Sequence, residues 1–253
     1  MAYALDGIIG HVTGSAAPGT TLTMKRGSLT LQDKNGKAPY VVGLMIATTA
    51  MVRESYINFK VDSESSKTEA YRRFYPMILN DVPPVAEGLG FFPIMRQCKK
   101  GDVLDVRGVD VATTEVISVV ILIHYGGPPR VRKISSNTPI YSFGITAATP
   151  VDLGTTYGDT GLDDIASGVL NFLPKKMDVI GGYCIPENAS VGGVGFEQAC
   201  DDGVIPNIGC GNGFLHLGGG DVVVLAEVDN DTAINAKGVA IAAGEVEAGF
   251  YAI

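Results

Sequence analysis

The chain has 253 residues, 46% of them hydrophobic and 18% charged, which is enough for one large domain or two of roughly 100 to 150 residues. Its formal net charge is −8, and no Lys/Arg run resembles a nucleic-acid-binding arm, which argues against direct binding to nucleic acid. The longest apolar run, at 116–123, is far shorter than the roughly 20 residues that cross a bilayer, so we expect no transmembrane segment.

Many short strands joined by tight turns are predicted by 33 glycines, 13 prolines and apolar runs rich in Val and Ile. The N-terminus lacks the basic start of a secretory signal, so we expect either synthesis in the cytoplasm or a chain that is already mature. The predicted strands are 21–32, 40–52, 55–62, 102–111, 115–125, 139–148, 177–185, 189–198, 221–229 and 236–245.

Two segments predict short helices inserted between strands. Residues 63–80 place Ser66 and Glu69 at capping-box spacing, ahead of apolar residues near helical spacing that end near Pro76. Residues 159–174 place five apolar side chains on one helical face before a terminating proline.

The two halves of the chain resemble each other. KKGDVLDV (99–106) matches GGGDVVVL (218–225) at an offset of 119, which also places apolar residues 119–122 on 238–241. Upstream, 57–61 matches 194–198 at an offset of 137, with Phe59 on Phe196. We attribute the change of offset to the helical insertion at 63–80.

A linker is predicted at the midpoint. The segment GGPPRVRKISSNTP (126–139) combines Gly-Gly, Pro-Pro, a basic cluster and Ser-Ser-Asn, none of which we expect to continue a strand ladder. The predicted organisation is a first unit at 1–128, a linker at 129–138 and a second unit at 139–253.

Charge is divided unequally between the halves. Residues 1–133 hold 16 Lys and Arg against 12 Asp and Glu, whereas 134–253 hold 3 against 15. The asymmetry has two interpretations. It is either chance variation of surface residues or the mark of a subunit whose basic half binds the acidic half of a neighbouring subunit.

No motif predicts catalysis, a cofactor or a metal site, so we expect a protein that is not an enzyme. His11, His124 and His216 lack a second ligand at suitable spacing and are interpreted as surface or core histidines. The cysteines contain no C-x-x-C pair and are interpreted as buried thiols: Cys98, Cys184, Cys200 and Cys210.

The remaining polar patterns are weak. The glycine-rich stretches 209–213 and 218–220 do not lead from a strand into a helix, so we interpret them as turns rather than phosphate-binding loops. Acidic residues at 163–164, 201–202 and 229–231 would hold calcium only if their loops converged. Asn188 and Asn230 fit the glycosylation sequon.

Two similar all-β units, each with about eight strands, predict two tandem eight-stranded jelly-roll β-sandwiches with short helical insertions, a fold of viral capsid proteins, lectins and cupins. In its duplicated GDV blocks, central linker and helix DTGLDDIASGVLNFL, the chain resembles the double jelly-roll major capsid proteins of icosahedral double-stranded DNA viruses. That lineage includes adenovirus hexon and the coat proteins of membrane-containing phages and archaeal viruses. The resemblance spans nearly the whole chain and is one of architecture.

The resemblance implies a homotrimer that forms a pseudo-hexagonal capsomer of a virion shell. Its partners would be neighbouring capsomers, with minor capsid, penton or membrane proteins, and it would be made in the host cytoplasm. Two alternatives stay open. A bicupin-like or glycan-binding sandwich would have a pocket of convergent polar groups, but the cupin histidine pattern is missing. A surface-layer or filament protein would assemble through open contacts instead of closed trimers.

Overall fold

The structure, a computed structural model, describes residues 3–14, 19–48, 55–63, 70–79, 86–87, 91–113, 115–144, 151–153, 158–159, 176–186, 192–198, 204–206, 211–229, 234–240 and 244–253. Within these ranges the chain forms 24 β-strands and no helix, so the predicted all-β class is confirmed. None of the described segments is a helix long and apolar enough to cross a membrane.

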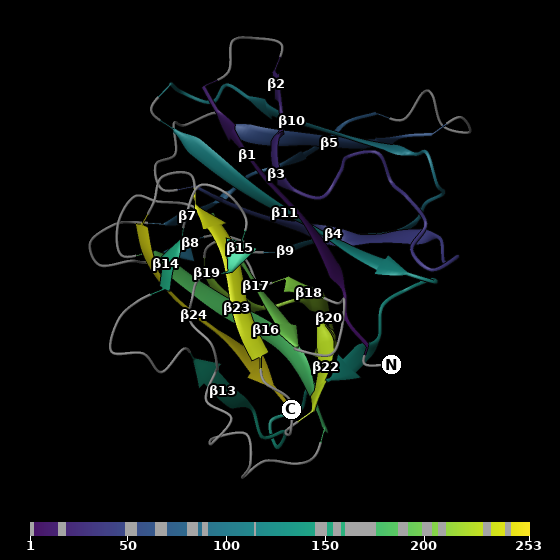
Figure 1. Cartoon of the computed structure of the whole chain (residues 1–253), viewed down its shortest axis with the longest axis vertical. Helices are drawn as coiled ribbons and strands as arrows, with labels where there is room; N and C mark the ends of the chain where they lie inside the picture. Colours follow the sequence, from purple (N-terminus) through teal and green to yellow (C-terminus); the bar gives the residue numbers. More distant parts are fainter. Residues whose placement is uncertain are drawn as a thin grey trace.

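The first half forms two sheets that face each other (Figure 1). Its strands are β1 (Asp6–Thr13), β2 (Thr20–Thr21), β3 (Thr23–Arg26), β4 (Pro39–Thr48), β5 (Tyr56–Asp62), β6 (Arg72–Phe74), β7 (Met77–Leu79), β8 (Ala86–Glu87), β9 (Phe91–Gln97), β10 (Val103–Val109) and β11 (Val116–Tyr125). One sheet has seven strands in the order β3-β1-β11-β4-β7-β8, with β9 also paired to β4. The other has four strands in the order β2-β10-β5-β6.

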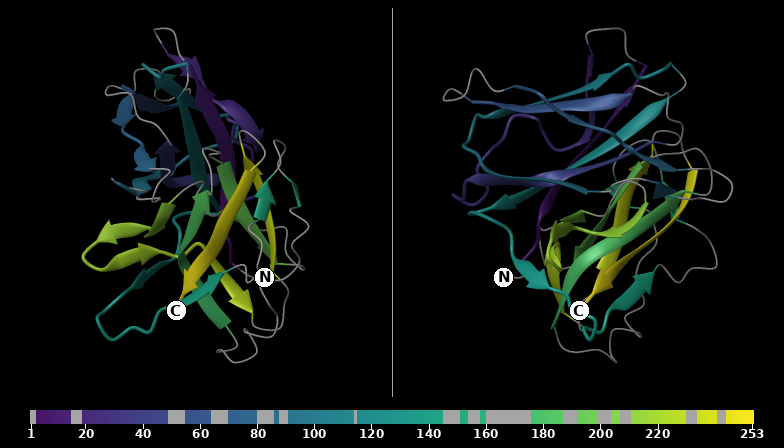
Figure 2. Two further views of the ribbon diagram at one scale, coloured as in Figure 1. Left: turned by 90° about the vertical axis from the view of Figure 1, so that its left-hand side faces the viewer. Right: turned by 180° about the vertical axis from the view of Figure 1, so that it is seen from behind.

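The second half lies beside the seven-stranded sheet (Figure 2). The central segment contributes β12 (Val131–Lys133). The strands of the second half are β13 (Tyr141–Gly144), β14 (Val151–Leu153), β15 (Gly158–Asp159), β16 (Lys176–Pro186), β17 (Gly192–Gln198), β18 (Val204–Pro206), β19 (Gly211–Phe214), β20 (His216–Gly218), β21 (Asp221–Val223), β22 (Ala226–Asp229), β23 (Ile234–Ala240) and β24 (Gly244–Ala252). One sheet runs β13-β24-β16-β19, with β14 on β24 and β22 on β16. A second runs β15-β23-β17-β18, and a third, of three strands, runs β12-β21-β20.

The two halves repeat one order of strand pairing. In the first half the order β1-β11-β4-β9 stands in one sheet and β2-β10-β5-β6 in the other. In the second half the corresponding orders are β13/β14-β24-β16-β19/β22 and β15-β23-β17-β18. Each half therefore has eight strand positions, paired 1-8-3-6 and 2-7-4-5 in chain order. The first half adds β3, β7 and β8, the central segment adds β12, and the second half adds the hairpin β20–β21.

The seven-stranded sheet is buried on both faces, and the four-stranded sheet on one. Along β11, Val119 and Ile121 pack into the core between the two sheets of the first half, whereas Val120 and Leu122 pack towards the second half. This double burial explains the apolar run at 119–123 in β11. In β5, by contrast, Ile57, Phe59 and Val61 are buried and the alternate residues are not, as expected of a sheet with one face in water.

The predicted helix at 63–80 is wrong over its described part. Arg72–Phe74 forms β6 and Met77–Leu79 forms β7. Phe74 packs against the rings of Phe59 and Phe92, so alternation across an edge strand buries this side chain without a helix. Ser66 and Glu69 lie outside the described residues, as does the predicted helix at 159–174 apart from Asp159 in β15.

The repeat is present, but one of its predicted registers is wrong. KKGDVLDV leads into β10, the seventh of the eight strand positions of the first half. GGGDVVVL instead contains the β20–β21 turn, which lies between β19 and β22, the two strands of the sixth position of the second half. The counterpart of β10 is β23, which pairs with β17 as β10 pairs with β5. The similarity is local: Gly101 and Gly220 both have positive φ, at 91° and 85°, ahead of Asp and Val. Likewise, residues 119–122 lie in β11 at position 8, whereas 238–240 lie in β23 at position 7.

The match between 57–61 and 194–198 is confirmed in position, because β5 and β17 occupy the same place in the two four-stranded sheets. The insertion lies later than predicted. β6 pairs with β5 as β18 pairs with β17, so the elements added after this position in the first half are β7 and β8.

The central segment also differs from the prediction. Val131–Lys133 forms β12, an edge strand paired with β21, so this part of the segment does continue a ladder. Among the other predicted strands, 21–32 ends at Arg26 and 221–229 is broken after Val223. Strands β1 and β9 had no prediction.

Candidate functional site: the junction and the outer face

The junction between the halves is an apolar cluster to which both contribute. The seven-stranded sheet supplies side chains from around β1, β4, β9 and β11, and the second half supplies side chains from around β16, β20 to β22 and β24. The buried members are Leu5, Ile9, Val42, Met45, Phe91, Val120, Leu122, Met177, Val179, Leu215, Val223, Leu225, Ala226, Val228, Phe250 and Ala252. Separating the halves would expose this cluster to water, so it favours one fixed relation between them.

The start of the described chain extends the junction through its backbone. The Leu5 N–H donates to the Leu225 carbonyl at 2.8 Å, and the Glu227 N–H donates to the Tyr3 carbonyl at 2.7 Å. Ala4 forms an isolated bridge with Ala226. The segment before β1 is thereby tied to the second half (Figure 1).

Ion pairs join the central segment to the second half. Arg130 lies 3.1 Å from both Asp178 and Glu227, and Arg132 also pairs with Asp178. Lys176 pairs with Glu227 at 3.0 Å. Both arginines belong to the basic half and both carboxylates to the acidic half. Part of the opposite charge of the halves is therefore neutralised within one chain.

Tyr3 lies beside this ion-pair network, and Arg130 contacts both its ring and its hydroxyl group. The Arg130 guanidinium stands 5.1 Å from the centre of the Tyr3 ring, and the Arg130 backbone N–H donates to the Tyr3 hydroxyl at 2.9 Å. Burial raises the pKa of Tyr3 to about 12, against the opposing effect of Arg130. Hydrogen bonds from Lys176 and Arg130 lower the pKa of Glu227.

A second candidate region is the outer face of the first half, which we define as the solvent side of β5, β6 and β10 with the residues flanking β6. Strand alternation places here the residues that do not point into the core. Its members are Tyr56, Asn58, Lys60, Asp62, Tyr71, Arg73, Tyr75, Val103, Asp105 and Arg107. The face lies on the side of the first half that is remote from the junction (Figure 1).

Cations and aromatic rings alternate across the outer face. Lys60 lies 4.9 Å from the Tyr71 ring centre, and Arg73 lies 4.9 Å from that of Tyr56. The rings of Tyr56 and Tyr75 are 5.9 Å apart. Such cation–π and ring contacts keep long side chains ordered at a water-facing surface.

Asp105 is the carboxylate at the centre of this face. Arg107 Nε donates to it at 2.7 Å, and the Tyr71 hydroxyl donates to its other oxygen. Burial raises the pKa of Asp105, but the hydrogen bonds from Arg107 and Tyr71 outweigh it, and the pKa is lowered overall. Asp105 therefore stays ionised and engaged at neutral pH.

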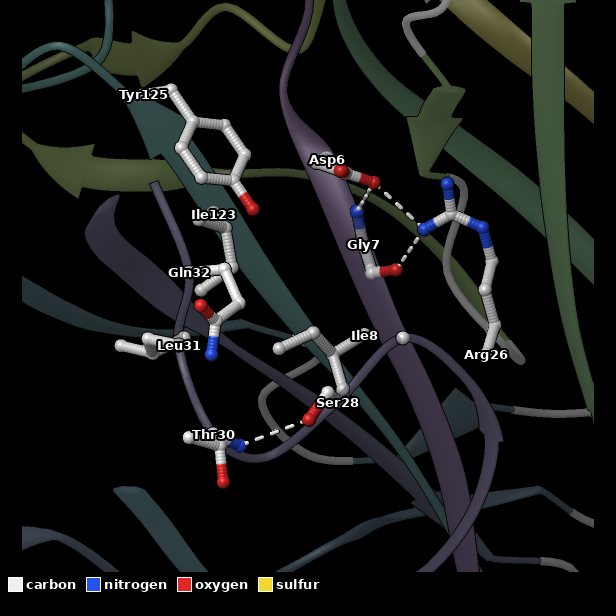
Figure 3. A pocket seen from close by; sticks show the side chains of 11 residues that line it. Asp6, Gly7, Ile8, Arg26, Ser28, Thr30, Leu31, Gln32, Ile123 and Tyr125 are labelled. Carbon is white, nitrogen blue, oxygen red and sulfur yellow. Dashed lines mark hydrogen bonds and ion pairs between the residues drawn. The ribbon is translucent and has the colours of Figure 1, made fainter. Parts of the chain in front are cut away.

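A small cavity of about 240 Å³ opens at the edge of the first half, between β1, β11 and the loop after β3 (Figure 3). Arg26 donates to Asp6 at 2.7 Å, and Lys34 lies 3.6 Å from the same carboxyl group. The cavity is smaller than the roughly 300 Å³ at which ligand pockets begin. Because its carboxylate is already paired with two cations, we assign it no catalytic or metal-binding role.

The structure does not bring the three histidines together. His11 is buried in β1 with no hydrogen-bond partner for Nδ1, and burial lowers its pKa, helped by Lys25. His124 Nδ1 lies 2.8 Å from the Gly127 carbonyl, and its ring lies 5.1 Å from that of Tyr3. His216 is exposed on β20.

The other sequence candidates are scattered or outside the described residues. Cys98 is a buried thiol in the core of the first half, and Cys184 lies in β16. Gly218–Gly220 form the β20–β21 turn with positive φ. Residues 163–164, 188, 200–202, 209–210 and 230–231 are outside the described ranges. Over the parts of the chain that are described, no three His, Cys, Asp or Glu side chains are grouped to hold a metal ion.

The junction arginines and the outer-face tyrosines had no role in the sequence prediction. A signal for the outer face exists in YINFKVD and VLDVRGV, where apolar residues alternate with aromatic or polar ones such as Tyr56, Lys60 and Asp105. The junction has no comparable local signal, since its pairs join residues at least 46 positions apart.

No protein-family model matches the chain, and no curated protein matches it. Three solved structures of infectious bursal disease virus align with all of this chain. The T13 IBDV viral particle aligns at 13% identity over 70% of that chain, with a TM-score of 0.22. The derived T=1 particles align at 11% over 70%, with a TM-score of 0.16, and the Gx strain at 11% over 73%, with a TM-score of 0.17. At these TM-scores the likeness carries no weight in the reasoning that follows.

Proposed function

We propose that the chain is a major capsid protein of an icosahedral double-stranded DNA virus, made in the host cytoplasm and located in the virion shell. In this proposal, residues 1–128 and 139–253 are two jelly rolls joined by a linker at 129–138. The supporting observation is the repeated strand order 1-8-3-6 and 2-7-4-5 in the two halves. Eight strands in two facing sheets with Greek-key connections constitute a jelly roll, a frequent fold of capsid proteins.

Duplication gives the proposal its assembly geometry. Three copies of a two-roll chain place six similar units around one axis, which yields a pseudo-hexagonal capsomer. Each contact between copies then joins the first roll of one chain to the second roll of the next. Such a heterologous contact closes into a ring when the two surfaces are different and complementary. Neighbouring capsomers, and minor capsid, penton or membrane proteins, would be the further partners.

The junction supports this reading, because a pseudo-symmetric ring requires both rolls to keep one orientation. The shared apolar cluster and the Arg130–Asp178 pair resist rotation of one half against the other. Free domain motion, the default for small polar domain interfaces, is disfavoured by a core of this kind.

The charge asymmetry supports heterologous contact as well. The pairs of Arg130 and Arg132 with Asp178 and Glu227 neutralise part of it inside the chain. The second half, with 3 basic and 15 acidic residues, retains an acidic excess that a neighbouring basic surface can meet. The protein in this proposal makes and breaks no covalent bond.

Size-exclusion chromatography with light scattering tests the proposal on the intact chain. We expect a stable particle of three times the chain mass, and pseudo-hexagonal outlines in negative-stain images. A monomer that takes up a stoichiometric divalent metal or a glycan would favour the bicupin-like or glycan-binding alternative. Open-ended polymers would favour a surface-layer or filament protein. Either result would overturn the capsomer proposal.

A further inference from the structure

We propose that the outer face of β5, β6 and β10 is the surface with which one copy of the chain binds the next, and that it contacts the start of the second half of that copy at Ile140 and Tyr141. The inference rests on the proposed function, because it assigns surfaces to the contact that closes the trimer.

The first argument is the distribution of exposed apolar side chains. Among the residues whose side-chain burial the structure describes, six large apolar side chains are exposed, and they fall into two groups. Tyr71, Tyr75 and Val103 are 37%, 51% and 38% exposed and belong to the outer face. Val131, Ile140 and Tyr141 are 43%, 41% and 37% exposed and belong to the segment that leads into the second half. A heterologous contact requires two such distinct patches on one chain.

The second argument is composition. Tyrosine and arginine are the residues most enriched at the energetic centre of protein interfaces, because they bury large areas and still hydrogen bond. The outer face carries three tyrosines and two arginines, held in place by their mutual stacking. Since these side chains are already ordered, binding costs them little conformational entropy.

The third argument is charge. Lys60 and Arg107 are engaged by Asp62 and Asp105, but no carboxylate of the described residues lies within ion-pair distance of Arg73, which stacks on Tyr56. Arg73 therefore presents an unneutralised cation. A second copy offers the complement, because its residues 134–253 carry 15 acidic side chains against 3 basic ones.

The position of the patches agrees with a ring. β6, which carries Arg73, is an edge strand of its sheet, and β13, which begins at Tyr141, is an edge strand of another. Exposed sheet edges tend to be covered in stable assemblies. The outer face is remote from the junction, so its occupation by a neighbour leaves the intramolecular contact intact (Figure 2).

The test uses two double variants of the intact chain, Arg73→Glu with Tyr75→Ala on the outer face, and Ile140→Asp with Tyr141→Ala on the second patch. Each should weaken the trimer by about 30-fold or more, the effect of losing one interface hot spot. Lys37→Glu, a charge reversal on the same half outside the outer face, should leave it unchanged. All four substituted side chains are exposed, so far-UV circular dichroism and the unfolding midpoint should match those of the wild type.

Mixing the two variants gives the sharpest outcome. Each retains one intact surface, so an equimolar mixture should form a heterodimer that cannot close into a trimer. A wild-type trimer together with trimeric variants, or variants that stay monomeric when mixed, would overturn the assigned surfaces and leave the capsomer proposal standing. A wild-type chain that is not trimeric would instead overturn the proposed function.

Discussion

Asp178 Oδ1 lies 3.1 Å from Arg130 Nη2, and the Asp178 side chain is only 5% exposed. Arg130 comes from the segment between the halves and Asp178 from β16, so the pair fastens that segment to the second half. The Asp178 backbone is held as well, because its N–H and C=O both bond to Ile253 at 3.0 Å. Asp178 thereby connects to the middle of the chain through its carboxylate and to the end of the chain through its backbone.

Replacing Asp178 with Asn should destabilise the chain by about 1 to 3 kcal/mol, because Arg130 and Arg132 both lose a charged acceptor. The loss should fall short of that for a fully buried pair, since both arginines can still reach water. Urea unfolding measures the difference. Lys176→Gln, which removes a more exposed pair with Glu227, is the matched control and should cost about 1 kcal/mol or less. Equal effects for the two variants would contradict this account of the junction.

Tyr3 should make the chain sensitive to strong alkali. The pKa of Tyr3 in the folded chain is raised to about 12, above the ordinary value of 10.0. Its contribution to the free energy of unfolding is therefore complete below pH 10 and is lost as the pH rises towards 12. The difference in unfolding free energy between the wild type and Tyr3→Phe should therefore be constant from pH 7 to 9 and shift against the wild type above pH 10. Parallel curves at all pH values would show that Tyr3 titrates normally.

Gly43→Ala should destabilise the chain by about 1 to 3 kcal/mol through overpacking. A Cβ at Gly43 would lie 2.3 Å from the ring of Phe91 and 2.6 Å from the carbonyl oxygen of Phe92. The backbone oxygen cannot move aside as a flexible side chain could. Gly36→Asn is the control, because nothing lies within 4 Å of its Cβ position and Asn tolerates positive φ. Thermal unfolding of the wild type, Gly43→Ala and Gly36→Asn measures the difference. An unfolding midpoint for Gly43→Ala equal to that of the wild type would show that the close approach at Gly43 relaxes easily.

Salt should weaken the assembly if opposite charges contribute to it. Exposed charges are screened over about 8 to 10 Å at physiological ionic strength, so the trimer dissociation constant should rise between about 0.05 and 0.5 M NaCl. Light scattering over a dilution series at each salt concentration measures it. Trimers insensitive to salt would remove the charge argument and leave the apolar surfaces as the driving force.

Local periodicity predicted much of the strand content. The predictions at 55–62, 102–111, 115–125, 177–185 and 189–198 all match strands, because alternation and apolar runs report burial within a few residues. The helix predicted around Phe74 failed because residues at helical spacing can also be buried by an edge strand once a partner such as β5 is present. The spacing of apolar residues along the chain carries no information about which distant strand will pair with them.

Composition and short-range pattern were enough to predict the all-β class, the positions of the main strands and the correspondence of 57–61 with 194–198. Two features became apparent only in the folded chain: β23, not β21, is the counterpart of β10, and Arg130 and Arg132 meet their carboxylates within the chain. The physical reason is the same in both cases. A Gly-Asp-Val turn is a local feature that can precede strands at different positions in the fold, as at Gly101 and Gly220. Strand partners and ion pairs, in contrast, are selected by packing between segments far apart in the chain.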